Sequence, residues 1–137
     1  MSNIQVSFFS RWVLGLGAGL ALLAVVSGAF AAHGLRSTID AEQLSIFETA
    51  ARYQMYHALA LMIVGLLSLV PQFSSPLLKF AGGAFAAGIL LFCGSLYLLA
   101  LSGIGWLGAV TPIGGVAFLL GWLTTILAVL KQPSHPA

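Results

Sequence analysis

The chain has 137 residues, of which 60% are hydrophobic and only 6% are charged. Soluble globular proteins have roughly 25% charged residues, so this composition is typical of an integral membrane protein. The net charge of +2 is too small for a nucleic-acid-binding surface, and a single cysteine excludes a disulfide scaffold. We therefore expect the lipid bilayer as the chain's surroundings and no nucleic-acid partner.

Three long tracts of the chain contain no charged residue: 12–35, 53–78 and 80–130. A membrane-spanning helix needs about 20 residues, so the third tract is long enough to fold back as two helices. The sequence therefore predicts an all-α, integral membrane four-helix bundle, a single domain over 1–137 with spans at 12–35, 53–70, 76–101 and 112–130.

Helix breakers separate these predicted spans. A serine or threonine at the N-cap followed by proline at the first helical position is typical of a helix start. Ser75-Pro76 and Thr111-Pro112 both have this pattern. The glycine-rich stretch 102–105 is expected to end the third span.

The first apolar tract has an alternative interpretation as a signal peptide. Arg11 precedes it, and Ala29-Phe30-Ala31 has the form of a cleavage site. A signal peptide has an apolar core of about 7–15 residues, which is shorter than this tract. We therefore expect the first helix to be retained.

The only charge-rich stretch lies between the first two spans and predicts an amphipathic helical segment at 40–52. Asp40 with Gln43 resembles a capping box at its start, and the segment can continue directly into the second span. Glu48 and Arg52 are four residues apart in the order that favours an ion pair on one helix face. The alternative is a pair of charges at the level of the lipid headgroups.

The distribution of basic residues predicts the orientation. With four spans, Arg11, Lys79 and Lys131 lie on one side of the membrane, and Arg36 and Arg52 lie on the other. The positive-inside rule therefore favours cytoplasmic termini, by three basic residues to two. The predicted location is a bacterial inner (plasma) membrane.

Small residues recur every four positions along the predicted spans, as in Gly15-x3-Gly19, Ala24-x3-Gly28, Ala84-x3-Gly88 and Ala117-x3-Gly121. Such stripes allow close approach of helices in lipid. They favour packing within the bundle, and a seam between copies of the chain is the alternative.

A cluster of polar side chains is expected where the first span ends and the second begins. Its members are His33, Glu48, Arg52, Gln54, Tyr56 and His57. Ionisable groups near the hydrocarbon layer are functional candidates by default. The histidines suggest axial haem ligation, copper binding together with Met55, or a proton relay. The structural alternative is that His33 caps its helix and His57 forms a hydrogen bond across the bundle, and no cofactor is predicted.

Four sequence blocks resemble one family of small membrane proteins. They are GAFAAHGL at 28–35, YQMYHALAL at 53–61, CGSLY at 93–97 and TPIGG at 111–115. The resemblance is to domain of unknown function 423, a family that includes the animal transmembrane protein 256. It implies a four-helix inner-membrane protein with no established activity. At position 31, where the family pattern would have glycine, this chain has alanine.

The residues and the resemblance together favour a non-enzymatic accessory or scaffold protein of the membrane, with a homo-oligomer or another membrane protein as its partner. A small oligomeric transporter or channel is the main alternative, although the first span lacks the carboxylate that small multidrug exporters carry. A haem- or metal-binding protein using His33 and His57 is the third. No convergent set of acid, base and nucleophile indicates an enzyme.

Overall fold

The computed structural model describes residues 6–73 and 75–131, and these residues form helices and short connections without strands. The all-α fold class is confirmed. The first helix, α1 (Phe8–Phe30), continues through a π turn at Ala31–Leu35 and is followed by α2 (Ala41–Leu67). The helix α3 (Pro76–Gly88) continues through a second π turn at Ile89–Cys93 into α4 (Gly94–Ser102). A 3₁₀ turn at Gly105–Ala109 leads to α5 (Thr111–Leu130).

Three of the helical segments are long and apolar enough to cross a membrane: Phe8–Leu35, Pro76–Ser102 and Gly105–Leu130. The helix α2 is as long, with 27 residues, but it carries five of the six residues of the predicted polar cluster. By length and composition the described residues therefore contain three candidate spans, against the four that the charge gaps predicted.

The start of α2 is specified by its first residues. The Asp40 carboxylate accepts a hydrogen bond from the backbone N–H of Gln43 at 2.8 Å, and the Gln43 side chain accepts one from the Asp40 backbone at 3.4 Å. This reciprocal capping box satisfies two backbone donors that a helix start leaves unpaired. The helix then runs unbroken to Leu67, so the amphipathic segment expected at 40–52 and the span expected at 53–70 are one helix.

Two other boundaries follow from local chemistry, and one expectation was wrong. Pro76 opens α3 directly after Ser75. Gly103 ends α4 in the left-handed conformation (φ 69°), which glycine adopts without a steric penalty. Thr111 was expected to be the N-cap of α5, but it is the first residue of the helix and Val110 is the N-cap. Its hydroxyl pairs with the Ser95 hydroxyl of α4 at 2.8 Å.

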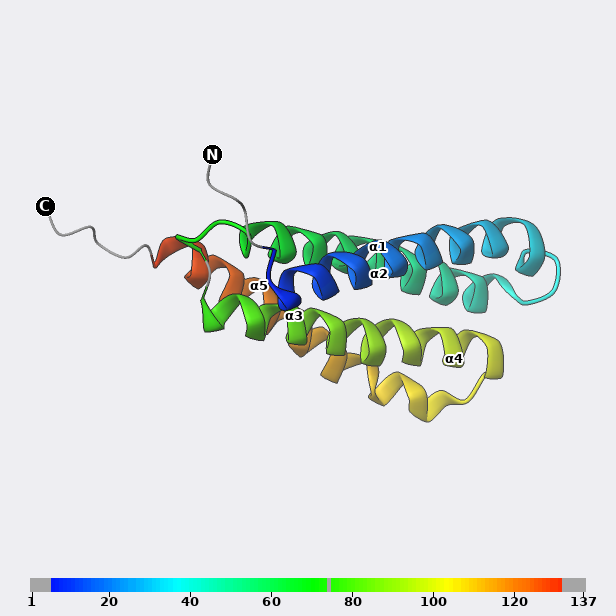
Figure 1. Ribbon diagram of the computed structural model, residues 1–137. Helices are drawn as coiled ribbons and strands as arrows, with labels where there is room; N and C mark the ends of the chain where they lie inside the picture. Colours follow the sequence, from blue (N-terminus) through cyan, green and yellow to red (C-terminus); the bar gives the residue numbers. More distant parts are fainter. Residues whose placement is uncertain (1–5, 74, 132–137) are drawn as a thin grey trace, which may run out of the picture.

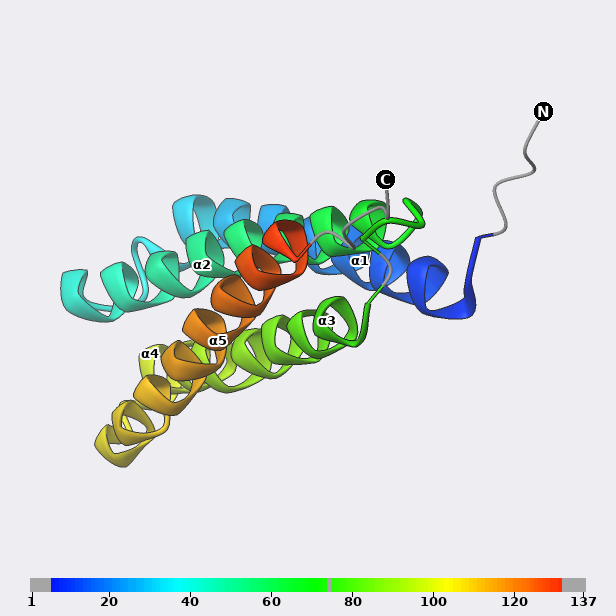
Figure 2. The same ribbon diagram turned by 90° about the vertical axis from the view of Figure 1, so that its left-hand side faces the viewer.

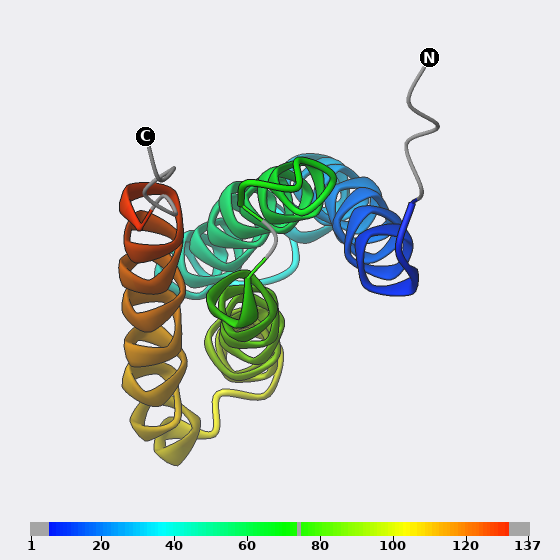
Figure 3. The same ribbon diagram turned by 60° about the vertical axis from the view of Figure 1, so that its left-hand side comes forward.

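The helices form two antiparallel hairpins, one of α1 with α2 and the other of α3–α4 with α5 (Figures 1 and 2). Seen close to the helix axes, α2 lies between α1 and the second hairpin (Figure 3). The helix α1 packs mainly against α2, whereas α2 also contacts α3 and α4. The centrally placed helix is therefore the most polar one.

The core lies where the two hairpins meet. Its largest fully buried side chains include Phe85 of α3 and Leu61 and Val64 of α2. A second, smaller cluster joins Ala31 and Leu35 of the first π turn to Phe47 and Ala100. The apolar core along α2 thus consists of two clusters, and the half-buried Tyr97 packs against both.

Glycines stand at the closest helix contacts. A Cβ at Gly121 would lie 2.7 Å from the Phe85 ring, and a Cβ at Gly114 would meet the backbone of Phe92 in the π turn. In contrast, Gly15, Gly19 and Gly28 on α1 have nothing within 4 Å at that position. The stripes on α3 and α5 therefore serve packing within the chain, and the stripe Gly15-x3-Gly19 does not.

We expect the Gly114→Ala substitution to destabilise the protein by about 2 kcal/mol, because overpacking against a backbone cannot be relieved by a side-chain rotation. The matched control is Gly115→Ala, whose new methyl group would meet only the Phe92 ring at 3.8 Å. Thermal unfolding of both variants in detergent measures the difference. Equal midpoints for the two variants would contradict this packing.

Candidate functional site

The predicted polar cluster is divided between two faces of α2. Gln54 and His57 are buried, with exposed fractions of 5% and 6%, and they face the other helices. Glu48, Arg52 and Tyr56 are exposed on the outer surface of the same helix. The six residues therefore do not form one site.

Gln54 connects three helices through its amide group. Its Nε2 donates to the backbone carbonyl of Leu20 in α1 at 2.9 Å, and its Oε1 accepts a hydrogen bond from the Tyr97 hydroxyl of α4 at 2.8 Å. Leu20 contributes only its carbonyl, which no sequence pattern would reveal. Buried polar groups in an apolar environment are costly unless paired, so this arrangement fixes α1 and α4 against α2.

His57 connects α2 to α5. Its Nε2 lies 3.3 Å from Nε1 of Trp122, and its Nδ1 lies 2.8 Å from the carbonyl oxygen of Tyr53. An indole N–H only donates, so Nε2 accepts and Nδ1 carries the proton that is donated to Tyr53. The Phe118 ring stacks on the imidazole, with ring centroids 3.4 Å apart and an interplanar angle of 7°. The imidazole is thus neutral, and both of its nitrogens are occupied.

Trp122 and Phe118, the partners of His57 in α5, are not among the residues predicted from the sequence. A usable signal existed, because they are four residues apart and so share one face of a helix. A tryptophan in the middle of an apolar tract also needs an acceptor for its N–H. These two features together mark the face of α5 that meets α2.

His33 lies apart from His57. It is exposed in the π turn that ends the first helix, beside the connection to the start of α2. His57 lies 16 residues beyond Ala41, the first residue of α2, which is about 24 Å along the helix axis. The structure therefore does not bring the two histidines together as axial ligands of one iron. Residues 6–73 and 75–131 include no group of three or more His, Cys, Asp or Glu placed to hold a metal ion.

Within the described part of α2, no ion pair joins Arg52 to Glu48, which was one of the two alternatives that the sequence left open for these residues. The Arg52 guanidinium instead donates a hydrogen bond to the hydroxyl of Thr49, one turn earlier in α2, at 3.3 Å. Both charged side chains line a shallow groove of about 340 Å³ between α1 and α2, with Ala24, Gly28, Ala51 and Met55. The outer face of this hairpin thus combines one acid, one base and several small residues.

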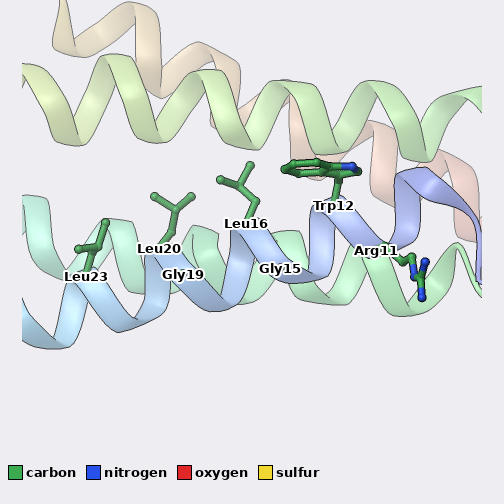
Figure 4. A pocket seen from close by; sticks show the side chains of 7 residues that line it. All are labelled: Arg11, Trp12, Gly15, Leu16, Gly19, Leu20 and Leu23. Carbon is green, nitrogen blue, oxygen red and sulfur yellow. The ribbon is translucent and has the colours of Figure 1, made fainter.

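A larger, apolar groove lies elsewhere on the described part of the chain. It measures about 600 Å³, and all its lining residues come from α1: Arg11, Trp12, Gly15, Leu16, Gly19, Leu20 and Leu23. In Figure 4, Trp12, Leu16 and Leu20 point from α1 toward the ribbon of α3–α4, with Arg11 at one end. None of the predicted cluster residues lies in this groove.

We predict that Gln54→Leu lowers the free energy of unfolding by about 1–2 kcal/mol, since hydrogen bonds between membrane helices contribute about 0.6 kcal/mol on average and at most about 1.7. The matched variant Tyr97→Phe removes only one of the two bonds and should cost less. A double-mutant cycle of the two substitutions in detergent should give a nonzero coupling energy. Strict additivity would contradict the Tyr97–Gln54 bond.

The chain is similar to bacterial proteins that are named only as membrane proteins. The model of the family described as Protein of unknown function (DUF423) matches residues 27–115. The UPF0382 membrane protein SAB0533 of Staphylococcus aureus (strain bovine RF122 / ET3-1) is 48% identical over 116 residues, which cover 85% of this chain and 93% of that protein. The UPF0382 membrane protein YwdK of Bacillus subtilis (strain 168) is 46% identical over 117 residues, covering 85% and 94%.

No solved structure matches the chain. The family model covers more than half of the chain, and the relatives align over nearly their whole lengths. The resemblance drawn from the four sequence blocks is therefore confirmed. Because the family model and these relatives match most of its length, and its helices are apolar enough to cross a membrane, the chain belongs to the DUF423 family of membrane proteins.

Proposed function

We propose that this protein is a non-enzymatic accessory or scaffold component of the bacterial inner membrane, with α2 as a fourth span and both termini in the cytoplasm. The observation that carries the proposal is that its buried polar side chains are committed to packing. Both nitrogens of His57 and both amide atoms of Gln54 form hydrogen bonds within the chain. Neither residue has a free polar atom directed toward a substrate.

The same pairing supports α2 as a span. A helix in lipid must satisfy its polar groups internally, and the inward polar residues of α2 do so. Its last ten residues, 58–67, include no charged residue. Just beyond them, the Ser68 hydroxyl lies 2.7 Å from the Ser10 hydroxyl of α1, as expected for an antiparallel contact. The two helices thus run alongside each other over the whole length of α2.

The orientation rests on the ends of the hairpins. Arg11 near the start of α1, Lys79 near the start of α3 and Lys131 after α5 lie at one end of the molecule. Arg36 lies at the opposite end, and Arg52 lies within α2. The positive-inside rule assigns the end with more basic residues to the cytoplasm.

A small oligomeric transporter is the second candidate, and the exposed Glu48 and Arg52 are the observation that favours it. Charged residues within membrane segments commonly mark ion or substrate pathways. Glu48 and Arg52 lie on the outside of the α1–α2 hairpin, so a pathway lined by them would have to form between two copies of the chain.

The proposed function predicts a colourless, metal-free protein. We would record the absorption spectrum and metal content of the detergent-purified protein beside the His33→Ala/His57→Ala variant. The expected result is no Soret band and no stoichiometric metal in either sample. A Soret band or a bound metal that is lost in the variant would contradict the proposal and favour redox chemistry. Flux through proteoliposomes tests the transporter: a flux that Glu48→Gln abolishes while folding stays intact would favour that candidate.

A further inference from the structure

Arg52 lies too deep for the headgroups if α2 crosses the membrane, and Glu48 lies one helical turn nearer the start of the same helix. Gln54 bonds to the Leu20 carbonyl, and the groove between the helices puts Arg52 beside Ala24. Ala24 is 12 residues from Trp12 and 12 from Arg36, which is about 18 Å toward each end. The hydrocarbon layer is about 30 Å thick, so this position is near its middle.

An exposed charge at this depth is costly in contact with lipid. Charged residues in spans almost always face other protein or a water-filled cavity, and only those near helix ends reach the interface. Here the Arg52 guanidinium has the Thr49 hydroxyl as its partner, and both charged side chains remain exposed on the hairpin. This face therefore needs a protein cover.

The chemistry of the face is complementary to itself. It carries one acid and one base a single helical turn apart. A two-fold axis along the membrane normal would therefore bring each acid within one helical turn of the partner's base, a separation that these long side chains can span. The small residues Ala24, Gly28 and Ala51 line the groove, and a Cβ at Gly28 would meet nothing within 4 Å. A lipid phosphate would pair with Arg52 but would leave Glu48 unpaired.

We propose that a second copy of this chain covers the α1–α2 face, with Glu48 of each copy paired with Arg52 of the other. The inference rests on the proposed placement of α2 across the membrane. Each pair connects the two subunits across one helical turn, and the small residues of α1 and α2 let the hairpins approach closely.

Two single variants test these pairs when they are co-expressed. E48R gives a chain with two cations on the face, and R52E gives a chain with two anions. Each variant should lose self-association by at least about tenfold, because like charges opposed in an interface cost several kcal/mol. Co-expressed with different tags, the two variants should co-purify as well as wild-type copies do, since only the mixed dimer restores opposite charges. An intrachain role of the pair predicts no such recovery and would overturn the proposal.

A cross-linking experiment keeps the proposal testable even if the charge variants fold poorly. In a Cys93→Ala background, Met55→Cys should form disulfide-linked dimers in membranes, whereas Leu119→Cys on the exposed face of α5 should not. Equal cross-linking at both positions, or none at Met55→Cys, would count against the second copy. Dimers containing an unrelated protein would instead show a different partner on this face and overturn the proposal as well.

The placement of α2 is checked separately with Leu59→Cys in the same background. A membrane-impermeant maleimide should fail to label it from either side. Labelling would reject the fourth span and remove the basis of the inference. Absence of labelling together with failed charge recovery would reject the dimer alone.

Discussion

The fold depends on satisfying the polar side chains of α2 within an apolar bundle. Gln54 and His57 are buried among apolar side chains, so they must find their hydrogen-bond partners on neighbouring helices. Gln54 takes them from α1 and α4, and His57 takes one from α5. These bonds determine which helices surround α2, and they explain why the most polar helix lies between α1 and the second hairpin.

Close packing at small residues complements these bonds. Gly17 of α1 lies against Ala58 and Met62 of α2, where a Cβ would come within 2.8 Å of the Ala58 carbonyl. Gly121 of α5 receives the ring of Phe85 in the same way. Because lipid gives helices no hydrophobic incentive to associate, contact at such positions supplies much of the attraction. The open glycines of α1 lie on surfaces that the chain itself does not cover.

The sequence predicted the helical class, the turns and the capping box because charge gaps, prolines and caps are local signals. It did not predict how α2 is rotated about its axis, which separates buried His57 from exposed Tyr56 next to it. That rotation depends on partners in other helices, such as the Leu20 carbonyl and Trp122. The π turns were also missed, since the one at Ile89–Cys93 forms where Gly114 approaches Phe92 from another helix.

The central claim is that His57 is a structural element joining two helices, and its tautomer tests this most directly. The ¹⁵N chemical shifts of His57 in lipid bilayers, measured by solid-state NMR, distinguish the two neutral tautomers from the imidazolium and from a metal-bound ring. The structure predicts the neutral form with the proton on Nδ1, because Nε2 accepts from Trp122. Trp122→Phe should shift the Nε2 signal. A proton on Nε2, a charged ring or a metal-bound nitrogen would contradict the account.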